Sequence, residues 1–261
     1  MTNSERLQAL RYLLKRTSTK YQNPKIIDMP LNLEDRGNND INLKQYSMCY
    51  PVGNNELKKL CGPDWTFVSW PSANIRKYSW TRNQIILNSF IKPRIEKVAW
   101  AGNIYSPLSD VIEHKTRPKL YEIGKKNSEI FEIRHIAPNN GQIEKRTKNY
   151  MSFTELLKYK YLLDIGGNGY SGRLKYLMFS RRPLLIVQRK YVEFWHEELK
   201  PYEHFVPVKE DLSDLIEKTT WLMDNQKESN HIATNMFNFA IARFKLKNLL
   251  EKVNSIFIEN F

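Results

Sequence analysis

Apolar residues recur at helical spacing near both ends of the chain. In residues 4–16, Leu7, Leu10, Leu13 and Leu14 share one face of a predicted helix. We expect that face to pack on the core, with a helix lying on a membrane surface as the alternative. The same spacing predicts helices over residues 79–96, ended by Pro93, and over residues 211–226 and 235–257.

Strand-like and helix-like segments alternate from about residue 97 onward. Short apolar runs predict strands at 97–102, 130–137, 161–165 and 183–188, and helical patterns cover 152–160 and 172–181. Ser106 followed by Pro107 predicts the start of another helix. This alternation predicts right-handed βαβ units and a parallel sheet, hence an α/β fold. The first 90 residues are less regular, with a short strand that runs into a loop predicted over 25–35 and strands predicted at 45–52 and 65–71.

The break near Pro93 is the predicted boundary between two parts of the chain. We expect an N-terminal lobe over residues 1–94, a second lobe over 95–235 and a final helix over 236–261 that braces the two. Two α/β lobes that face each other leave a cleft, where ligands tend to bind.

Composition narrows the class of protein. The chain has 261 residues, of which 41% are hydrophobic, enough for a substantial core. Cys49 and Cys61 are too few for a disulfide framework and lack zinc-site spacing, which favours a reducing compartment. The N-terminus has no continuous apolar leader, and no run of about 18 apolar residues exists. We therefore expect a cytoplasmic protein.

The formal net charge of +13 favours anionic partners such as nucleotides, phosphorylated glycans, nucleic acid or an acidic membrane face. The basic residues are spread along the chain, so a soluble, lysine-rich surface is an equal alternative. Because no helix-turn-helix or finger motif stands out, we expect no nucleic-acid partner.

A glycine-rich turn follows the predicted strand at 161–165. Gly167 to Gly172 spell G-x-G-x-x-G, and a predicted helix comes next. Glycines let the backbone approach a ligand closely, and a helix N-terminus favours an anion. Arg173 and Lys175 add positive charge that we expect a phosphate group to neutralise. A tight strand-to-helix turn with no ligand is the alternative.

A nicotinamide site requires an acidic residue about 20 positions further on. The next strand instead ends in Gln188, Arg189 and Lys190. This basic pair suits a 2′-phosphate, so an NADP-dependent oxidoreductase remains one alternative function. A catalytically inactive protein that binds glycan or nucleic acid is another.

The residues around the turn resemble glycosyltransferase family 90, which includes capsule xylosyltransferases, protein O-glucosyltransferases and lipopolysaccharide-modifying enzymes. The resemblance rests on K-Y-x5-G-x3-S-x-R-x-K-x-L from Lys160 to Leu177, then L-K-P-Y-x-H-F-V-P-V and D-L-S. Upstream, D-W-T-F at residues 64–67, P-L-N-L-E-D-R-G at 30–37 and A-W-A-G at 99–102 resemble further family elements. Two features differ from the family pattern: the loop at residues 101–106 lacks its arginine, and Gly37 stands where proline is usual.

The resemblance implies a GT-B architecture of two Rossmann-like lobes, with a UDP-sugar held by the C-terminal lobe. It implies inverting transfer without a metal or other cofactor, and no D-x-D metal motif is present. Xylose or glucose is the sugar we expect. The acceptor would be a glycan or glycolipid, such as an anionic lipopolysaccharide core or a capsule glycan. Peripheral association with the inner membrane surface is left open.

The resemblance also implies roles for individual residues. Asp35 matches the family's catalytic carboxylate and would take the acceptor's proton, with Glu34 as fallback; a solvated loop acid is the alternative. Trp65 and Trp70 would stack on the acceptor, although core packing explains tryptophans equally well. The donor would be bound by Gly102, Ser106, Asp164, Gly167, Gly169, Ser171, Gly172, Arg173 and Lys175. We expect Asp35 to reach the donor only when the two lobes close.

Overall fold

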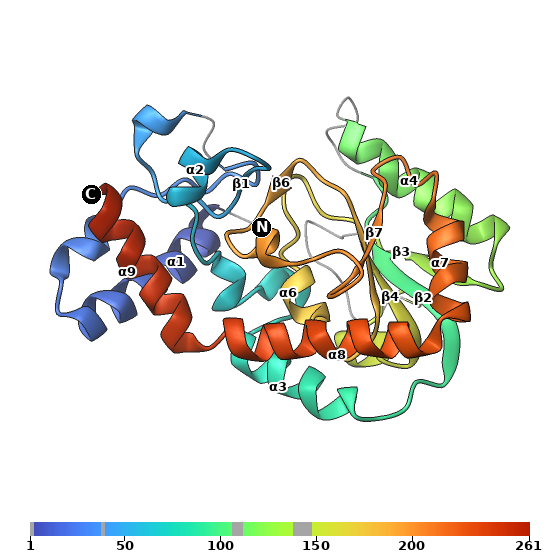
Figure 1. Ribbon diagram of the computed structural model, residues 1–261. Coiled ribbons are helices and arrows are strands. Elements are labelled where there is room, and N and C mark those ends of the chain that lie inside the picture. The colour runs from blue at the N-terminus through green and yellow to red at the C-terminus, as the bar shows by residue number, and fades with distance from the viewer. Residues whose placement is uncertain (1–2, 38–39, 106–111, 138–147) are drawn as a thin grey trace.

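The computed structural model describes residues 3–37, 40–105, 112–137 and 148–261. In Figure 1, a parallel sheet with helices around it occupies the right, and a part rich in helices and loops lies at the left. The helices are α1 (Asn3–Tyr21), α2 (Asn55–Lys59), α3 (Tyr78–Ser89), α4 (Ile112–Lys126), α5 (Phe153–Leu156), α6 (Leu174–Leu177), α7 (Leu215–Asp224), α8 (Gln226–Arg243) and α9 (Leu246–Asn260).

The sheet confirms the predicted α/β class. Its five strands are all parallel, in the order β3-β2-β4-β5-β7. They are β2 (Ile95–Gly102), β3 (Phe131–His135), β4 (Tyr159–Asp164), β5 (Leu184–Val187) and β7 (Val206–Val208). The chain passes from β2 to β3 on one side and then crosses to β4 on the other. Ligands of open α/β sheets bind beyond the carboxyl ends of strands at such a reversal.

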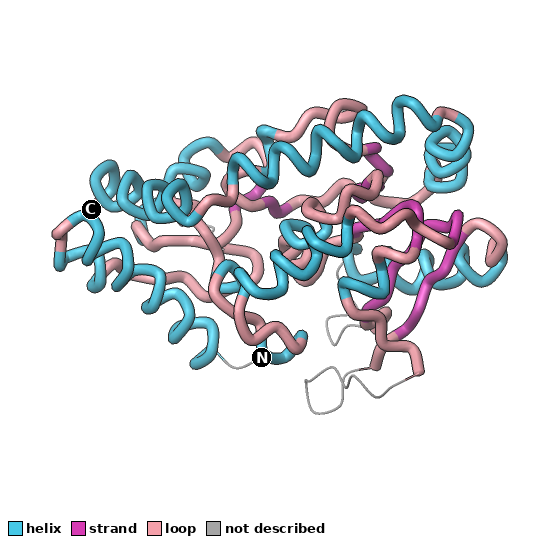
Figure 2. Tube along the Cα trace, turned by 90° about the horizontal axis from the view of Figure 1, so that it is seen from below, coloured by secondary structure: helices cyan, strands magenta, loops and turns pink. Residues whose placement is uncertain are grey.

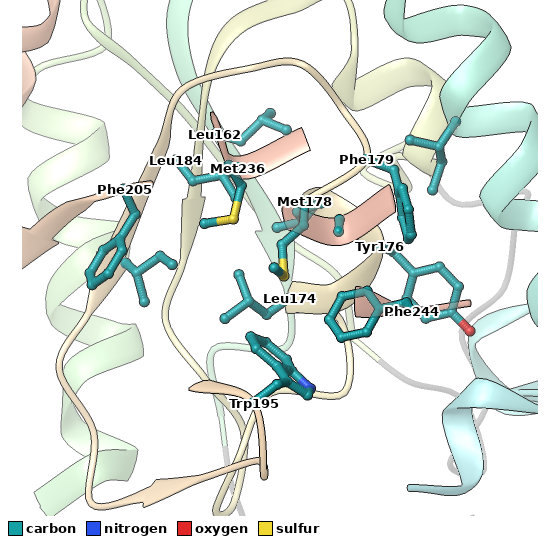
Figure 3. Packing of buried hydrophobic residues seen from close by; sticks show 14 of the residues in the cluster. Leu162, Leu174, Tyr176, Met178, Phe179, Leu184, Trp195, Phe205, Met236 and Phe244 are labelled. Carbon is teal, nitrogen blue, oxygen red and sulfur yellow. The ribbon is translucent and has the colours of Figure 1, made fainter. Parts of the chain in front are cut away.

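Alternating residues of the strands enter two different apolar clusters. Leu162, Leu184 and Ile186 face a cluster that also holds Met236 from α8 and residues of α3 and α6. Figure 3 shows Leu162, Leu184 and Met236 close together in this cluster, with Leu174 nearby. The intervening residues of the strands face a second cluster, covered by α4 and α7: Tyr161, Leu163, Leu185 and Val187. Helices therefore bury both faces, as a parallel sheet requires.

The N-terminal part differs from the expected second Rossmann-like lobe. Within the described residues of 3–94, the one named strand is β1 (Tyr50–Pro51), which pairs antiparallel with β6 (Tyr191–Val192). The short strand predicted at the start of 25–35 and the strand predicted at 65–71 are wrong, because the chain forms 3-10 turns at Pro24–Asp28, Trp65–Phe67 and Pro71–Ala73. The strand predicted at 45–52 is reduced to β1. Proline at the start of two of these turns fixes φ and removes a ladder donor, which favours a turn over a strand.

The predicted helix over 235–257 is interrupted, so that α8 ends at Arg243 and α9 begins at Leu246. Phe244, at the break, is buried against the rings of Phe67 and Trp195. Helix α9 lies beside α1, and the face of α1 that holds Leu10, Leu13 and Leu14 is buried, as predicted (Figure 1). None of the described helices is long and apolar enough to cross a membrane. The division at residues 94 and 235 stays a prediction.

Candidate functional site

A cleft of about 430 Å³ opens beyond the carboxyl ends of β2 and β4. The loop after β2, the glycine loop after β4, α1 and the turns at residues 65–73 form its walls. Eight of the residues predicted for the site line this cleft: Asp35, Trp65, Trp70, Gly102, Gly167, Ser171, Gly172 and Arg173. Ser106 lies outside the described residues. The cleft thus joins residues predicted for the catalytic, donor and acceptor roles.

Two arginines form a cationic centre in the cleft. Arg173 Nη1 donates to the carbonyl of Ala101 at 2.6 Å, and Arg117 Nη1 donates to the carbonyl of Asn103 at 2.9 Å. Arg117 also donates to the carbonyl of Gly166, which ties the loop after β2 to the glycine loop. Burial, reinforced by the nearby Arg173, lowers the pKa of Arg117 to about 10. Arg117 comes from α4, and nothing in its local sequence marked it as part of a site.

Asp164 is buried next to this cationic centre, which corrects its predicted role as a contact of the donor sugar nucleotide. Its side chain is fully buried and does not line the cleft. Ser171 Oγ donates to its carboxylate at 2.8 Å and Arg189 Nη2 at 2.7 Å, and Arg173 Nε lies 3.8 Å away. Burial alone would raise the pKa of Asp164, but Arg189, Arg173 and Ser171 outweigh it and lower the pKa. Asp164 thus pairs with Arg189 and lies near Arg173, and Arg117 adds a third positive charge close by, so positive charge is in excess here.

Lys175 does not face the cleft, and its predicted contact with phosphate is wrong. The side chain is fully buried, and its Nζ lies 3.0 Å from Asp64 and 2.8 Å from Glu193. Nζ also donates to Thr66 Oγ1 at 2.8 Å. Burial would lower the pKa of Lys175, but the two carboxylates outweigh it and raise the pKa. Burial, opposed by Lys175, raises the pKa of Glu193 to about 8.

Close packing explains much of the glycine motif. A Cβ on Gly172 would lie 3.2 Å from Thr66, and one on Gly167 would lie 3.0 Å from the carbonyl oxygen of Tyr170. Gly102, at the end of β2, is also closely packed, because a Cβ there would lie 2.8 Å from the Trp100 ring. The helix predicted over 172–181 shrinks to the four residues of α6, and the first N–H of α6, that of Leu174, already bonds to Ser171. The N–H of Leu174 is therefore not free for a phosphate group, and the arginines carry the positive charge of the cleft. The phosphate site expected at this helix N-terminus stays a prediction.

Asp35 lies directly against the glycine loop. A Cβ on Gly169 would lie 1.8 Å from the carbonyl oxygen of Asp35, so Gly169 serves loop packing and does not line the cleft. Asn168 Nδ2 donates to the Asp35 carboxylate at 3.5 Å. The expectation that Asp35 reaches the donor side only after lobe closure is corrected, because the two loops are already in contact.

Arg6 is a site residue that local sequence patterns did not reveal. It projects from α1, and its Nη2 forms an ion pair with Asp35 at 2.9 Å. Its Nη1 donates to the carbonyl of Leu33 at 2.8 Å, and its guanidinium lies over the Trp65 ring, 5.6 Å from the centroid. Arg6 therefore fixes both the carboxylate and the loop that carries it.

The two predicted acceptor tryptophans form one aromatic corner of the cleft. Trp65 and Trp70 pack edge to face, with ring centroids 5.5 Å apart. Trp65 is nearly buried, whereas Trp70 is partly exposed. In the described part of the chain, two buried donors at this corner, Trp65 Nε1 and Arg6 Nε, have no hydrogen-bond partner. A ligand with hydroxyl oxygens would satisfy such groups.

Part of the cleft lining is apolar. It is made by Ile136, Met151, Phe153 and Leu156, and Trp70 packs against the same apolar cluster. The cleft therefore offers an apolar surface, a cationic centre and a carboxylate with aromatic neighbours. Within the described residues, no group of three or more His, Cys, Asp or Glu side chains is arranged to hold a metal ion.

Comparison with known proteins identifies relatives of this chain. The model of glycosyl transferase family 90 matches residues 23–259. Protein O-glucosyltransferase 3 of Rattus norvegicus is 32% identical over 123 residues, which cover 47% of this chain and 23% of that protein. Protein O-glucosyltransferase 2 of Danio rerio is 35% identical over 148 residues, covering 54% of this chain and 27% of that protein. The matched segments thus span about a quarter of these relatives.

Among solved structures, Anabaena Alr3699/HepE in complex with UDP-glucose is similar to part of the chain. The TM-score is 0.40 at 11% sequence identity, and the similarity covers 69% of this chain and 46% of HepE.

Proposed function

The chain belongs to glycosyltransferase family 90, and on this premise we propose that it transfers a sugar from a UDP-sugar to a glycan hydroxyl with inversion. The observation that carries the proposal is the pairing of a cationic centre, Arg117 and Arg173, with a carboxylate, Asp35, in one cleft. The centre suits a diphosphate, and the carboxylate suits a hydroxyl that must lose a proton.

The proposed reaction is a direct displacement. The acceptor oxygen attacks the anomeric carbon, the bond from that carbon to the UDP oxygen breaks, and the acceptor proton passes to Asp35. UDP leaves with the electron pair and an added negative charge, which Arg117 and Arg173 stabilise. Because one displacement occurs from the face opposite the leaving group, the anomeric configuration inverts.

Both arginines have further N–H groups that can bind the diphosphate. Arg173 has one hydrogen bond, to Ala101, and Arg117 has two, to Asn103 and Gly166, among the described residues. Each guanidinium carries five N–H groups, so both can also donate to phosphate oxygens. The excess of positive charge around Asp164 supports an anion at this point, and so does the depressed pKa of Arg117.

The chemistry of the cleft lining suggests where each ligand would lie. The uracil ring would rest on the apolar lining near Met151 and Phe153, and the acceptor sugar would lie by Trp65 and Arg6. The unpaired donors Arg6 Nε and Trp65 Nε1 support a hydroxylated acceptor there. In this arrangement the arginines contact the diphosphate without a metal ion as intermediary.

Glucose is the donor sugar best supported, because two relatives are named protein O-glucosyltransferases. Xylose is the alternative that the resemblance implies. The acceptor would be a glycan or glycolipid, with a lipopolysaccharide core or capsule glycan as examples. The charge of +13 supports an anionic acceptor, and a cytoplasmic location is part of the proposal.

The NADP alternative loses its main support. Under this alternative Arg189 would bind the 2′-phosphate of NADP. Its guanidinium instead pairs with Asp164 at 2.7 Å and does not line the cleft. Calorimetry with UDP and NADPH separates the two functions. We expect UDP to bind in the micromolar to millimolar range, about 4–8 kcal/mol, and NADPH not to bind.

A panel of UDP-sugars, assayed for hydrolysis with and without EDTA, tests the activity itself. We expect UDP release from UDP-glucose or UDP-xylose that persists in EDTA. NADPH binding without UDP binding would overturn the proposed function, and a requirement for added metal would overturn the role of the arginines.

A further inference from the structure

Two adjoining grooves lie beside α1, apart from the cleft. The first, of about 660 Å³, runs between α1 and α9, which lie next to each other in Figure 1. The second, of about 510 Å³, is bounded by α1, the segment at residues 67–82 and the start of α9. Tyr12, Arg16 and Leu246 line both grooves, so the two form one continuous surface, which we call the α1–α9 surface.

Positive charge dominates the α1–α9 surface. Among its lining residues there is no Asp or Glu, while seven side chains are cationic: Lys15, Arg16, Lys20, Arg76, Lys77, Arg82 and Lys247. None of these seven forms an ion pair with a carboxylate of the described residues. All are solvent-exposed except Arg82, which is half-buried. The surface therefore gathers uncompensated charge, unlike a face on which acidic and basic residues alternate.

Large apolar side chains are exposed among these cations. Tyr12 is 52% exposed and Leu246 is 42% exposed, and both line the grooves. Trp80, adjacent to the groove residue Ser79, is 65% exposed. Figure 2, seen from below, shows the helices next to the two chain ends, α1 and α9, on the half of the molecule away from the sheet. Amphipathic aromatic residues beside lysines and arginines are typical of surfaces that lie in a membrane interface.

We propose that the α1–α9 surface docks on a lipid bilayer that contains anionic headgroups. The cations would contact the headgroup phosphates, and Tyr12, Trp80 and Leu246 would enter the interface. A soluble polyanion would account for the cations but would leave the exposed apolar side chains without a role, so the bilayer explains both. The inference goes beyond the proposed transfer reaction and does not depend on it, because no groove residue carries a catalytic or donor-binding role.

The surface has a definite relation to the cleft. Residues 67–69 and 76–79 line the second groove, while Trp65, Trp70, Ser72 and Ala73, in the same stretch of chain, line the cleft. The segment at residues 65–79 therefore separates the two. A bilayer on the α1–α9 surface would therefore lie against the same segment whose other residues line the cleft.

Sedimentation with lipid vesicles tests the proposal. We would compare phosphatidylcholine vesicles with vesicles that also contain phosphatidylglycerol, using the full chain. The groove variant combines K15Q, R16Q, K20Q and K247Q. The control variant removes the same charge from exposed lysines elsewhere: K125Q, K126Q, K209Q and K227Q. Thermal unfolding and UDP binding verify that both variants remain folded.

We expect the wild-type protein to bind vesicles that contain phosphatidylglycerol and not pure phosphatidylcholine. The groove variant should bind at least about tenfold more weakly, and the control variant within about twofold of wild type. Trp80→Gln should weaken the binding that persists at high salt. Equal losses in both charge variants would show a general charge effect and overturn the proposal. Binding to heparin without binding to vesicles would overturn it in favour of a soluble polyanion.

Discussion

Arg173 and Lys175 lie two residues apart and should respond differently to substitution. Arg173 lines the cleft, whereas Lys175 is enclosed by Asp64 and Glu193 at 3.0 and 2.8 Å. Replacing each with methionine removes the charge and keeps much of the side-chain length. The account predicts lost ligand affinity for Arg173→Met and lost stability for Lys175→Met.

The magnitudes follow from the contacts. Loss of charge-assisted hydrogen bonds to the diphosphate should cost about 1.5–3 kcal/mol, or about 10- to 150-fold in the UDP dissociation constant. Stability should change little, because Asp164 keeps its bonds to Arg189 and Ser171. Lys175→Met leaves the buried carboxylate of Asp64 without its cation, a change that costs about 3–5 kcal/mol in comparable buried pairs.

Urea unfolding and UDP calorimetry on the same preparations give the two readouts. Lys175→Met should lower the urea midpoint strongly while its folded fraction binds UDP within about threefold of wild type. Above about pH 8, where Glu193 is ionised, adding Glu193→Gln should recover part of the stability, since one carboxylate fewer is then uncompensated. The reasoning is refuted if Lys175→Met weakens UDP binding as much as Arg173→Met while stability is unchanged.

Three further substitutions probe the loops and the buried network. Because burial raises the pKa of Glu193 to about 8 from 4.5, the folded state holds this proton more tightly than the unfolded state. Stability should therefore fall as pH rises between about 4.5 and 8, and Glu193→Gln should flatten this fall in thermal melts. Gly169→Ala places a Cβ 1.8 Å from the carbonyl oxygen of Asp35. It should therefore lower the free energy of unfolding in urea by about 1–3 kcal/mol and slow sugar transfer. A variant as stable as the wild type would contradict this contact. Arg6→Met should slow sugar transfer about tenfold, within the range of a lost charge-assisted bond, and leave UDP affinity unchanged. Arg6→Lys should recover part of the transfer rate. A loss of UDP affinity would contradict the placement of Arg6 beside Asp35.

The sheet and the glycine loop could be predicted because their signals are local. Apolar runs such as Leu162–Leu163 and Leu184–Val187 belong to strands buried on both faces, and short helical segments separate them. The N-terminal strands could not be predicted reliably, since runs such as residues 65–71 are short and equally compatible with buried turns. The break between α8 and α9 depends on the packing of Phe244 with distant rings, which no local pattern reveals.

The site was predictable only in part, for the same reason. Arg173 and Lys175 both looked like phosphate ligands in sequence, and their separation arises from Asp64 and Glu193, more than a hundred and about twenty residues away respectively. Arg6 and Arg117 reach the cleft from helices that are remote in sequence from the glycine loop. Such long-range partners are set by topology, so a single sequence offers no pattern for them.

The central claim is that Asp35 acts as the base for transfer from a UDP-sugar. Asp35→Asn keeps the shape of the side chain and removes the proton acceptor. We would measure sugar transfer and UDP affinity on one preparation. The substitution should slow sugar transfer by a factor of about 10²–10⁴ and leave UDP affinity within about twofold of wild type. Transfer by Asp35→Asn at nearly the wild-type rate would contradict the claim and make Asp35 a loop acid, with Glu34 the next residue to test.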